Sequence, residues 1–221
     1  NELFLVMIGI TIAIVLNLFY DYEGQRQDLI RYMRETENQL QILLCELAAY
    51  LHNKDMEINV WDRIIAFEGR MHEFIKAAYD YQDNTFHSHP GYYIDYFEMR
   101  LAQLQVLHNL HYEIKKIRKM PKQALVIADY IMYMADYVVE MNIPDQQIEK
   151  LEEISEQMKQ EELPKTREEF EGRALLYHIL MDLEEFLVYK KRFVNGLDEK
   201  KLRIYWKQEM EQKDSANELQ K

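Results

Sequence analysis

The sequence predicts an all-helical protein: one N-terminal transmembrane helix followed by an antiparallel bundle of five to six long helices. Three observations support this fold class. The 221 residues include only 6 Gly and 4 Pro, too few for the tight turns of a sheet protein. Residues 3–19 are uncharged and apolar, and the rest of the chain places apolar side chains at helical spacing. We predict a transmembrane helix over 1–21, a cytoplasmic bundle over 22–196 and a charged tail over 197–221.

The apolar segment reads LFLVMIGITIAIVLNLF. Its 17 residues form a helix of about 26 Å, close to the roughly 30 Å hydrocarbon core of a bilayer. A signal peptide fits less well because Asn1 and Glu2 precede it instead of a basic segment, and a buried soluble helix is rarely apolar on every face. The residues expected to anchor the chain in the lipid bilayer are Leu3, Phe4, Ile8, Ile12, Leu16, Phe19 and Tyr20.

The charges beside this segment predict its orientation. Arg26, Arg31 and Arg34 follow it, and no Lys or Arg precedes it, so the positive-inside rule places the bundle in the cytoplasm. The chain begins with Asn rather than Met, and we expect a membrane domain with further spans to precede it.

Composition and motifs argue against several function classes. A net charge of −12 repels the phosphate backbone, so we expect no nucleic-acid partner. The sequence has no phosphate-binding glycine loop, G-x-S-x-G or H-E-x-x-H motif, and we expect no enzyme activity, cofactor or metal. His87 with His89, and His108 with His111, could offer metal ligands, but we interpret them as solvated or core-margin histidines.

The first helix of the bundle, about 22–52, carries an apolar seam with alternating spacings of four and three. This seam could bind a second copy of the chain, giving a homo-oligomer, or another helix of the same chain. Its members are Leu29, Met33, Thr36, Leu40, Leu43, Leu47 and Tyr50.

Further helices are predicted at about 58–81, 92–118, 122–141, 145–162 and 166–193. Thr166 and Glu169 form a capping box at the start of the last one, and Asn195 and Gly196 are expected to end it. Its residues expected to be buried are Phe170, Ala174, Tyr177, Met181 and Leu187.

An aromatic cluster that includes Tyr92, Tyr93 and Tyr96 flanks the loop over 82–91. An up-and-down bundle returns this loop to the end nearest the transmembrane helix. These tyrosines could therefore contact the membrane side or stack on an aromatic ligand, while ordinary core packing is the default interpretation. The same geometry places the basic run over 115–122 at the opposite end.

Three blocks of the sequence resemble the C-terminal half of the bacterial putative aromatic acid exporter family. They are IGITIAIVLNLFY over 8–20 followed by Tyr22-Glu23, HPGYYIDYFEMR over 89–100, and ELPKTREEFEGRALLYHILMDLEEFLVYKKRF over 162–193. The residues that carry the family signature are His89, Pro90, Tyr96, Phe97, Glu98, Arg100, Leu163, Pro164, Thr166, Arg167, Phe170 and Arg173.

The resemblance implies a cytoplasmic domain of a bacterial inner-membrane exporter of aromatic carboxylic acids or related organic anions. The domain would regulate the exporter, assemble it or cap its mouth. The family's preceding membrane helices are missing from this chain, so its partner is expected to be the membrane domain of the parent protein. The alternative is a single-pass, membrane-anchored helical sensor or scaffold.

Overall fold

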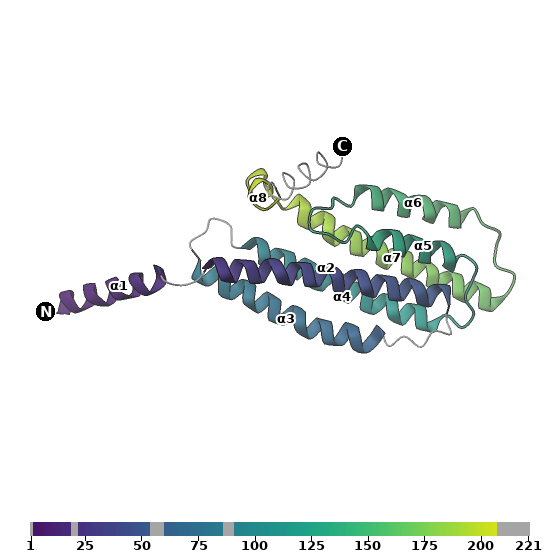
Figure 1. Ribbon diagram of the computed structural model, residues 1–221. Helices are drawn as coiled ribbons and strands as arrows, with labels where there is room; N and C mark the ends of the chain where they lie inside the picture. The colour runs from purple at the N-terminus through teal and green to yellow at the C-terminus, as the bar shows by residue number, and fades with distance from the viewer. Residues whose placement is uncertain (1, 19–21, 54–59, 86–90, 207–221) are drawn as a thin grey trace, which may run out of the picture.

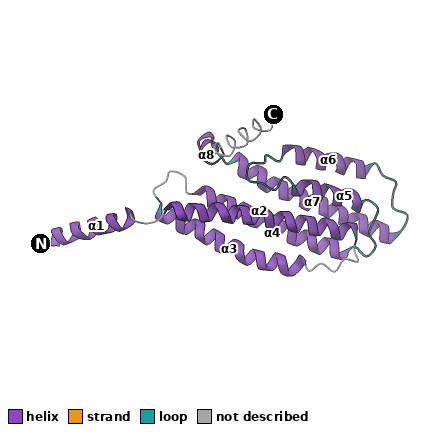
Figure 2. Cartoon of the chain, in the orientation of Figure 1, coloured by secondary structure: helices purple, strands orange, loops and turns teal. Residues whose placement is uncertain are grey.

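The structure is a computed structural model that describes residues 2–18, 22–53, 60–85 and 91–206. All regular secondary structure in these residues is helical, which confirms the predicted fold class (Figures 1 and 2). The helices are α1 (Glu2–Leu18), α2 (Tyr22–His52), α3 (Val60–Asn84), α4 (Gly91–Lys116), α5 (Ala124–Ala135), α6 (Asp145–Lys159), α7 (Arg167–Asn195) and α8 (Glu199–Tyr205).

Helices α2 to α7 form an antiparallel bundle with α4 in its interior (Figure 1). Helix α4 packs against α2, α3 and α7, while α5 lies along α2 and α6 lies along α7. The sequence of α4 explains its place, because apolar and aromatic side chains occur on nearly every face. Each fully buried large apolar side chain contributes about 1.5–3 kcal/mol, so this helix supplies much of the stability of the core.

The predicted seam of α2 is covered within the same chain. From Leu29 to Leu47 its members are at most 1% exposed, and only Tyr50 is half-buried. Helices α3, α4 and α5 provide the covering surfaces. Of the two predicted partners for the seam, the structure therefore shows the helices of the same chain. The seam has no free face for a second copy.

Helix α5 ends earlier than predicted. It stops at Ala135, and the N–H groups of Tyr137 and Val138 then donate to carbonyls three residues back. These tighter turns redirect the chain over 136–144 before α6 begins. As a result Glu140, expected within a helix, lies in the connection and is buried.

The start of α7 is capped much as predicted. The Thr166 hydroxyl accepts from the Glu169 N–H at 3.1 Å. The Glu169 carboxylate accepts from the N–H of Lys165, one residue before the cap, at 2.9 Å, which differs from the usual reciprocal pair. Gly196 ends α7 with a right-handed backbone, so this position does not need glycine for a left-handed conformation.

Helix α1 extends away from the bundle (Figure 1). Its apolar side chains from Leu3 to Ile12 are exposed. It has 17 described residues. Among the described helices none combines the length and the apolar character required to cross a bilayer, so the predicted transmembrane helix over 1–21 gains no support. The side chains of Leu16, Phe19 and Tyr20 lie outside the described ones.

The first part of the predicted charged tail belongs to the packed structure. Helix α8 lies in it, and Leu197 and Trp206 are buried against the bundle. Asp198 caps α8 by accepting from the Lys201 N–H at 2.7 Å. Residues 207–221 lie outside the described part of the chain.

Candidate functional site

Charged side chains from four segments meet inside the bundle and form a cluster that we call the charge cluster. Its buried members are Glu37 on α2, Arg100 on α4, Glu140 in the connection after α5, and Lys190 on α7. Each is at most 6% exposed. Charged residues are rarely buried unless they are paired, so their contacts decide what the cluster does.

Arg34 of α2, which is part-buried, joins the two carboxylates of the charge cluster. Its guanidinium donates to Glu37 at 2.9 Å and to Glu140 at 3.2 Å. On the other side of Glu37, the Arg100 guanidinium lies 3.6 Å away and the Tyr96 hydroxyl donates at 3.2 Å. These contacts connect α2 to α4 and to the connection after α5.

Glu140 receives further donors from two other elements, α4 and α7. The Tyr92 hydroxyl of α4 donates to its carboxylate, and the Lys190 ammonium of α7 donates to its backbone carbonyl. The indole N–H of Trp206, just after α8, in turn donates to the Tyr92 oxygen at 3.2 Å. The cluster therefore links the tail to the interior of the bundle.

Burial controls the ionisation of these groups. Burial lowers the pKa of Lys190 well below its usual value; nearby Arg100 adds to this effect and Glu140 opposes it. Burial also raises the pKa of Glu140, although the Tyr92 hydroxyl and Arg34 favour its charged form. For Tyr92 and Tyr96, burial is the main cause of a raised pKa.

The charge cluster is suited to holding segments together. Removing one partner of a buried ion pair costs about 3–5 kcal/mol, because the remaining charge stays buried without compensation. Gln103 extends the arrangement by accepting from Arg100 at 2.9 Å and donating to the Phe186 carbonyl of α7 at 2.8 Å. Helices α2, α4 and α7 and the connection after α5 are thereby joined through polar contacts as well as apolar packing.

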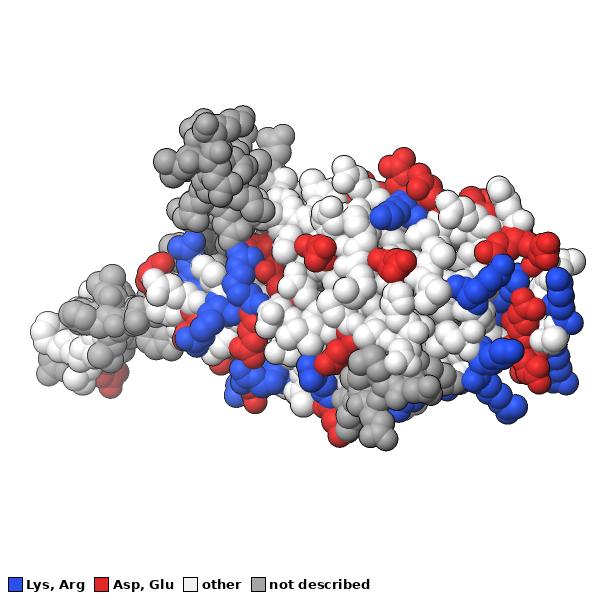
Figure 3. All heavy atoms as spheres, turned by 45° about the vertical axis from the view of Figure 1, so that its right-hand side comes forward, with Lys and Arg blue, Asp and Glu red and all other residues white. Residues whose placement is uncertain are grey.

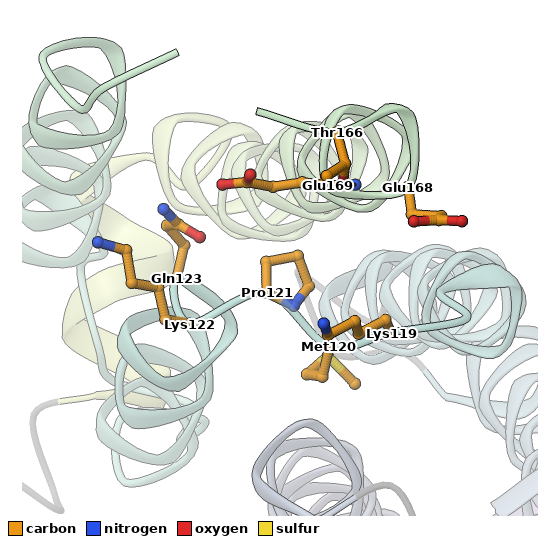
Figure 4. A pocket seen from close by; sticks show the side chains of 8 residues that line it. All are labelled: Lys119, Met120, Pro121, Lys122, Gln123, Thr166, Glu168 and Glu169. Atoms are coloured by element: carbon orange, nitrogen blue, oxygen red, sulfur yellow. Dashed lines mark hydrogen bonds between the residues drawn. The ribbon is translucent and has the colours of Figure 1, made fainter. Parts of the chain in front are cut away.

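Two neighbouring hollows lie at the end of the bundle opposite α1, where the α4–α5 connection meets the start of α7. The first, the proline hollow, measures about 300 Å³ and is shown in Figure 4. Its lining residues are Lys119, Met120, Pro121, Lys122, Gln123, Thr166, Glu168 and Glu169. The second, the aromatic hollow, measures about 240 Å³. Its lining residues are Gln123, Met158, Lys159, Glu161, Glu162, Leu163, Pro164, Phe170, Arg173, Ala174 and Tyr177.

Gln123 lines both hollows and rises from the start of α5 towards α7 (Figure 4). Its amide nitrogen donates to Glu161, while its amide oxygen is buried and has no hydrogen-bond partner. Arg173 donates to Glu169 and to the Glu162 carbonyl, each at 2.6 Å, but its Nε is buried without an acceptor. Both of these atoms are buried, so the surfaces of the hollows do not expose them.

The structure corrects the predicted burial of the outer stripe of α7. Phe170 is 61% exposed and Met181 is 64% exposed, Tyr177 is at the edge of exposure, and only Leu187 of the predicted set is buried. Helix α7 carries a second apolar stripe, and this one faces the core. Periodicity alone cannot decide between two such stripes. The stripe that faces the core includes Leu176, Ile179, Leu180, Leu183 and Phe186.

The family-signature residues lie in three places: the core with its charge cluster, the two hollows, and the exposed surface. Arg100 belongs to the charge cluster, Tyr96 donates to Glu37 of that cluster, and Phe97 packs in the core. Glu98 is exposed and accepts from the Tyr79 hydroxyl, while exposed Arg167 pairs with Glu171. The signature residues that line the hollows are Leu163, Pro164, Thr166, Phe170 and Arg173. His89 and Pro90 lie outside the described residues.

The tyrosines that were candidates for a membrane or ligand contact are all buried. Tyr92, Tyr93 and Tyr96 are at most 2% exposed, and Tyr205 stacks on Tyr92 with ring centroids 3.9 Å apart. They do lie at the end of the bundle nearest α1, as the up-and-down geometry predicts (Figure 1). The core-packing interpretation therefore describes them, and they present no contact surface.

The helical histidine pair packs against an aromatic ring. His108 and His111 both contact Trp61, and burial lowers the pKa of His111. Over the described ranges, no group of three or more His, Cys, Asp or Glu side chains is placed to hold a metal ion. His87 and His89 fall outside those ranges.

Charge is unevenly spread over the surface. On the face drawn in Figure 3, Lys and Arg gather towards the two ends, and the middle is largely uncharged. Helix α4 ends in Lys115 and Lys116 at the end opposite α1, as the bundle geometry predicts for the basic run.

Several residues of these sites were not predicted from the sequence. Glu37, Glu140 and Lys190 carry the charge cluster, and Gln123 links the hollows. A signal was present for Lys190, which lies three residues from Leu187 and from Phe193 and so occupies a buried helical position. A charge at such a position indicates a buried partner.

Comparison with known proteins agrees with this architecture. Residues 26–191 match the family described as putative aromatic acid exporter C-terminal domain. The "Uncharacterized protein YqjA" of Bacillus subtilis (strain 168) is 27% identical over 195 residues, which are 87% of this chain and 59% of the relative. The chain thus spans less than two thirds of that relative.

A solved structure has the same fold. It is the crystal structure of a putative membrane protein from Clostridium difficile 630, with a TM-score of 0.66 and 24% sequence identity. The match covers 75% of this chain and 98% of the other.

Proposed function

Because the chain belongs to the putative aromatic acid exporter C-terminal domain family, we propose that it regulates and assembles a membrane exporter of aromatic carboxylic acids or related organic anions. In this proposal the bundle lies on the cytoplasmic side of a bacterial inner membrane. The transport path is formed by a membrane domain that precedes the bundle in the parent protein.

The charge cluster is the observation that carries this proposal. Helix α2 follows the apolar helix α1 after residues 19–21, so force from a membrane domain would reach the bundle through α2. Arg34 and Glu37 of α2 are bound to Glu140 and Arg100 on other segments. A displacement of α2 alone would break buried ion pairs, and the bundle should therefore move as one body.

The test uses the full-length parent protein in bacterial cells, with labelled benzoate as the transported probe. We compare the intact protein, a deletion of residues 26–191 and the variant Glu140→Gln. The proposal expects the deletion to reduce efflux or the amount of assembled protein in the membrane. Glu140→Gln should alter the efflux rate per assembled protein, because it weakens the contacts that hold α2 in place.

Glu153→Gln is the matched control, since Glu153 is an exposed carboxylate of α6 and its loss should leave efflux unchanged. Efflux and assembly that are unaffected by the deletion would disprove the proposal. An equal effect of the two Glu→Gln changes would show that the charge cluster has no part in it.

A further inference from the structure

Helix α8 and the residue after it cover one side of the charge cluster. Trp206 is buried, and its indole N–H donates to the Tyr92 oxygen at 3.2 Å. The Tyr205 ring stacks on the Tyr92 ring with centroids 3.9 Å apart. Tyr92 in turn donates to Glu140. Undocking of α8 would therefore open this side of the charge cluster to water.

Lys190 lies beneath this cover. Its side chain is buried, and its nitrogen lies 5.8 Å from the centre of the Trp206 ring and 5.3 Å from that of Phe193. The nitrogen donates to the backbone carbonyl of Glu140, which is a neutral acceptor. Ring contacts at this distance are worth less than the hydration that an ammonium loses on burial. Docking of α8 therefore disfavours the charged form of Lys190.

The charges around Lys190 balance without it. Arg34 contacts both Glu37 and Glu140, and Arg100 lies 3.6 Å from Glu37. A proton on Lys190 adds a positive charge to these two guanidiniums and two carboxylates, inside the bundle. Burial and the nearby Arg100 accordingly lower the pKa of Lys190, while Glu140 and Glu37 oppose this effect.

The other titratable groups at this position leave the balance unchanged. Burial raises the pKa of Tyr92, so its hydroxyl stays uncharged. On the side of α6, Asp145 pairs with the neighbouring Lys191 at 3.0 Å. The excess charge therefore depends on the amine of Lys190.

We propose that α8 with Trp206 is a proton-sensitive latch over the charge cluster: docked α8 holds Lys190 uncharged, and proton uptake by Lys190 releases α8. The proton comes from water and binds to the Lys190 Nζ, and no other bond to hydrogen is made or broken by this step. The inference does not depend on the proposed role in export.

The sign of the pH dependence follows from the proton count. The undocked state binds one more proton than the docked state, so acidification favours undocking and docking strengthens as pH rises towards the ordinary lysine pKa of about 10.4. Titration of Glu140 would have the opposite sign, because burial raises its pKa and the docked state would then bind the extra proton.

Amide hydrogen exchange of α8 in the 221-residue chain measures this equilibrium, and it detects opening even when the undocked state is rare. Mass spectrometry follows the exchange at several values between about pH 6 and pH 9, and division by the intrinsic exchange rate at each pH gives the opening constant. We expect the opening constant to fall as pH rises, by at most about tenfold per pH unit for one proton.

Two matched variants identify the titrating group. Lys190→Met keeps an unbranched side chain and removes the amine, so the opening constant should become smaller at neutral pH and lose its dependence on pH. Lys191→Met is the control, because Lys191 is half-buried on the same helix and pairs with Asp145. It should keep the pH dependence of the unmodified protein.

Four outcomes would overturn the proposal. They are an opening constant of the unmodified protein that is independent of pH, one that rises with pH, a pH dependence that persists in Lys190→Met, or an equal change in the exchange of α4. The last outcome would show that the whole bundle opens rather than α8 alone. The first two are decided on the unmodified protein, so they do not require Lys190→Met to fold.

Discussion

Asp182 on α7 is a carboxylate in surroundings that favour its protonated form. Burial raises its pKa to about 6, and the nearby Glu113 and Glu185 add to this effect while His178 opposes it. One of its carboxylate oxygens is buried without a hydrogen-bond partner. Between about pH 4 and pH 6, Asp182 binds more protons in the folded protein than it does in the unfolded chain. The free energy of unfolding therefore falls as pH rises through this range, and the loss is complete above it.

Asp182→Asn should remove this penalty. At pH about 7.5 we expect the variant to unfold with a free energy about 1 kcal/mol higher than that of the unmodified protein, and the difference should vanish below pH about 4. Urea unfolding at several pH values measures it. Asp80→Asn, at an exposed position of α3, is the control for the loss of one carboxylate. If the difference in the free energy of unfolding between Asp182→Asn and the unmodified protein were the same at every pH, the raised pKa of Asp182 could not be its cause.

Gly172 lets α7 approach the α4–α5 connection. A Cβ atom at this position would lie 2.9 Å from the Pro121 Cγ and 3.4 Å from the Lys119 carbonyl oxygen. Gly172→Ala should therefore destabilise the protein by about 1–3 kcal/mol, because the ring or α7 must shift. Gly69 on α3 has open space around it, and Gly69→Ala should stabilise by about 0.5–1 kcal/mol. Chemical denaturation measures the change in the free energy of unfolding for both variants. If Gly172→Ala and Gly69→Ala changed it in the same direction, the close-packing argument for Gly172 would be refuted.

At the scale of elements, α8 shows how a short terminal helix is held. Trp206 at its end is buried and donates to Tyr92, and Tyr205 stacks on the same ring. Seven residues are too few for a helix that is stable by itself, so these contacts must supply the stability.

Trp206→Ala should lower the free energy of unfolding by about 2–4 kcal/mol, since it removes a large buried side chain. Ile204→Ala, at an exposed position of the same helix, should change it by less than about 0.5 kcal/mol. The chain has 2 tryptophans, so in a Trp61→Phe background the fluorescence of Trp206 alone reports whether α8 is docked. A stability equal to that of the unmodified protein for Trp206→Ala would show that the tail is not part of the cooperative unit.

The order and approximate limits of the bundle helices could be predicted because their apolar periodicity is strong. The seam of α2 agrees with the prediction, because its members from Leu29 to Leu47 are buried. Helix α7 shows where this approach fails, since it has apolar residues on two sides and only the packed structure shows that the side with Phe170 is open. The packing of α8 was also missed, because its segment is rich in charge and its burial depends on two residues, Leu197 and Trp206.

At the scale of the whole molecule, the charge cluster could not be predicted because it depends on contacts between distant segments. Arg34 and Glu140 are separated by 106 positions, and Tyr92 and Trp206 by 114. Local patterning carries no information about such partners. The hollows have the same origin, because the α4–α5 connection and the start of α7 form them together.

Helix α7 contributes Phe170 to the aromatic hollow and Lys190 to the charge cluster, twenty positions or about 30 Å along the same rod. Any occupant of the hollow that tilts this rod changes the environment of the Lys190 ammonium. If binding in the hollow changes the protonation equilibrium of Lys190 by some factor, protonation of Lys190 must change the affinity of the hollow for its occupant by the same factor.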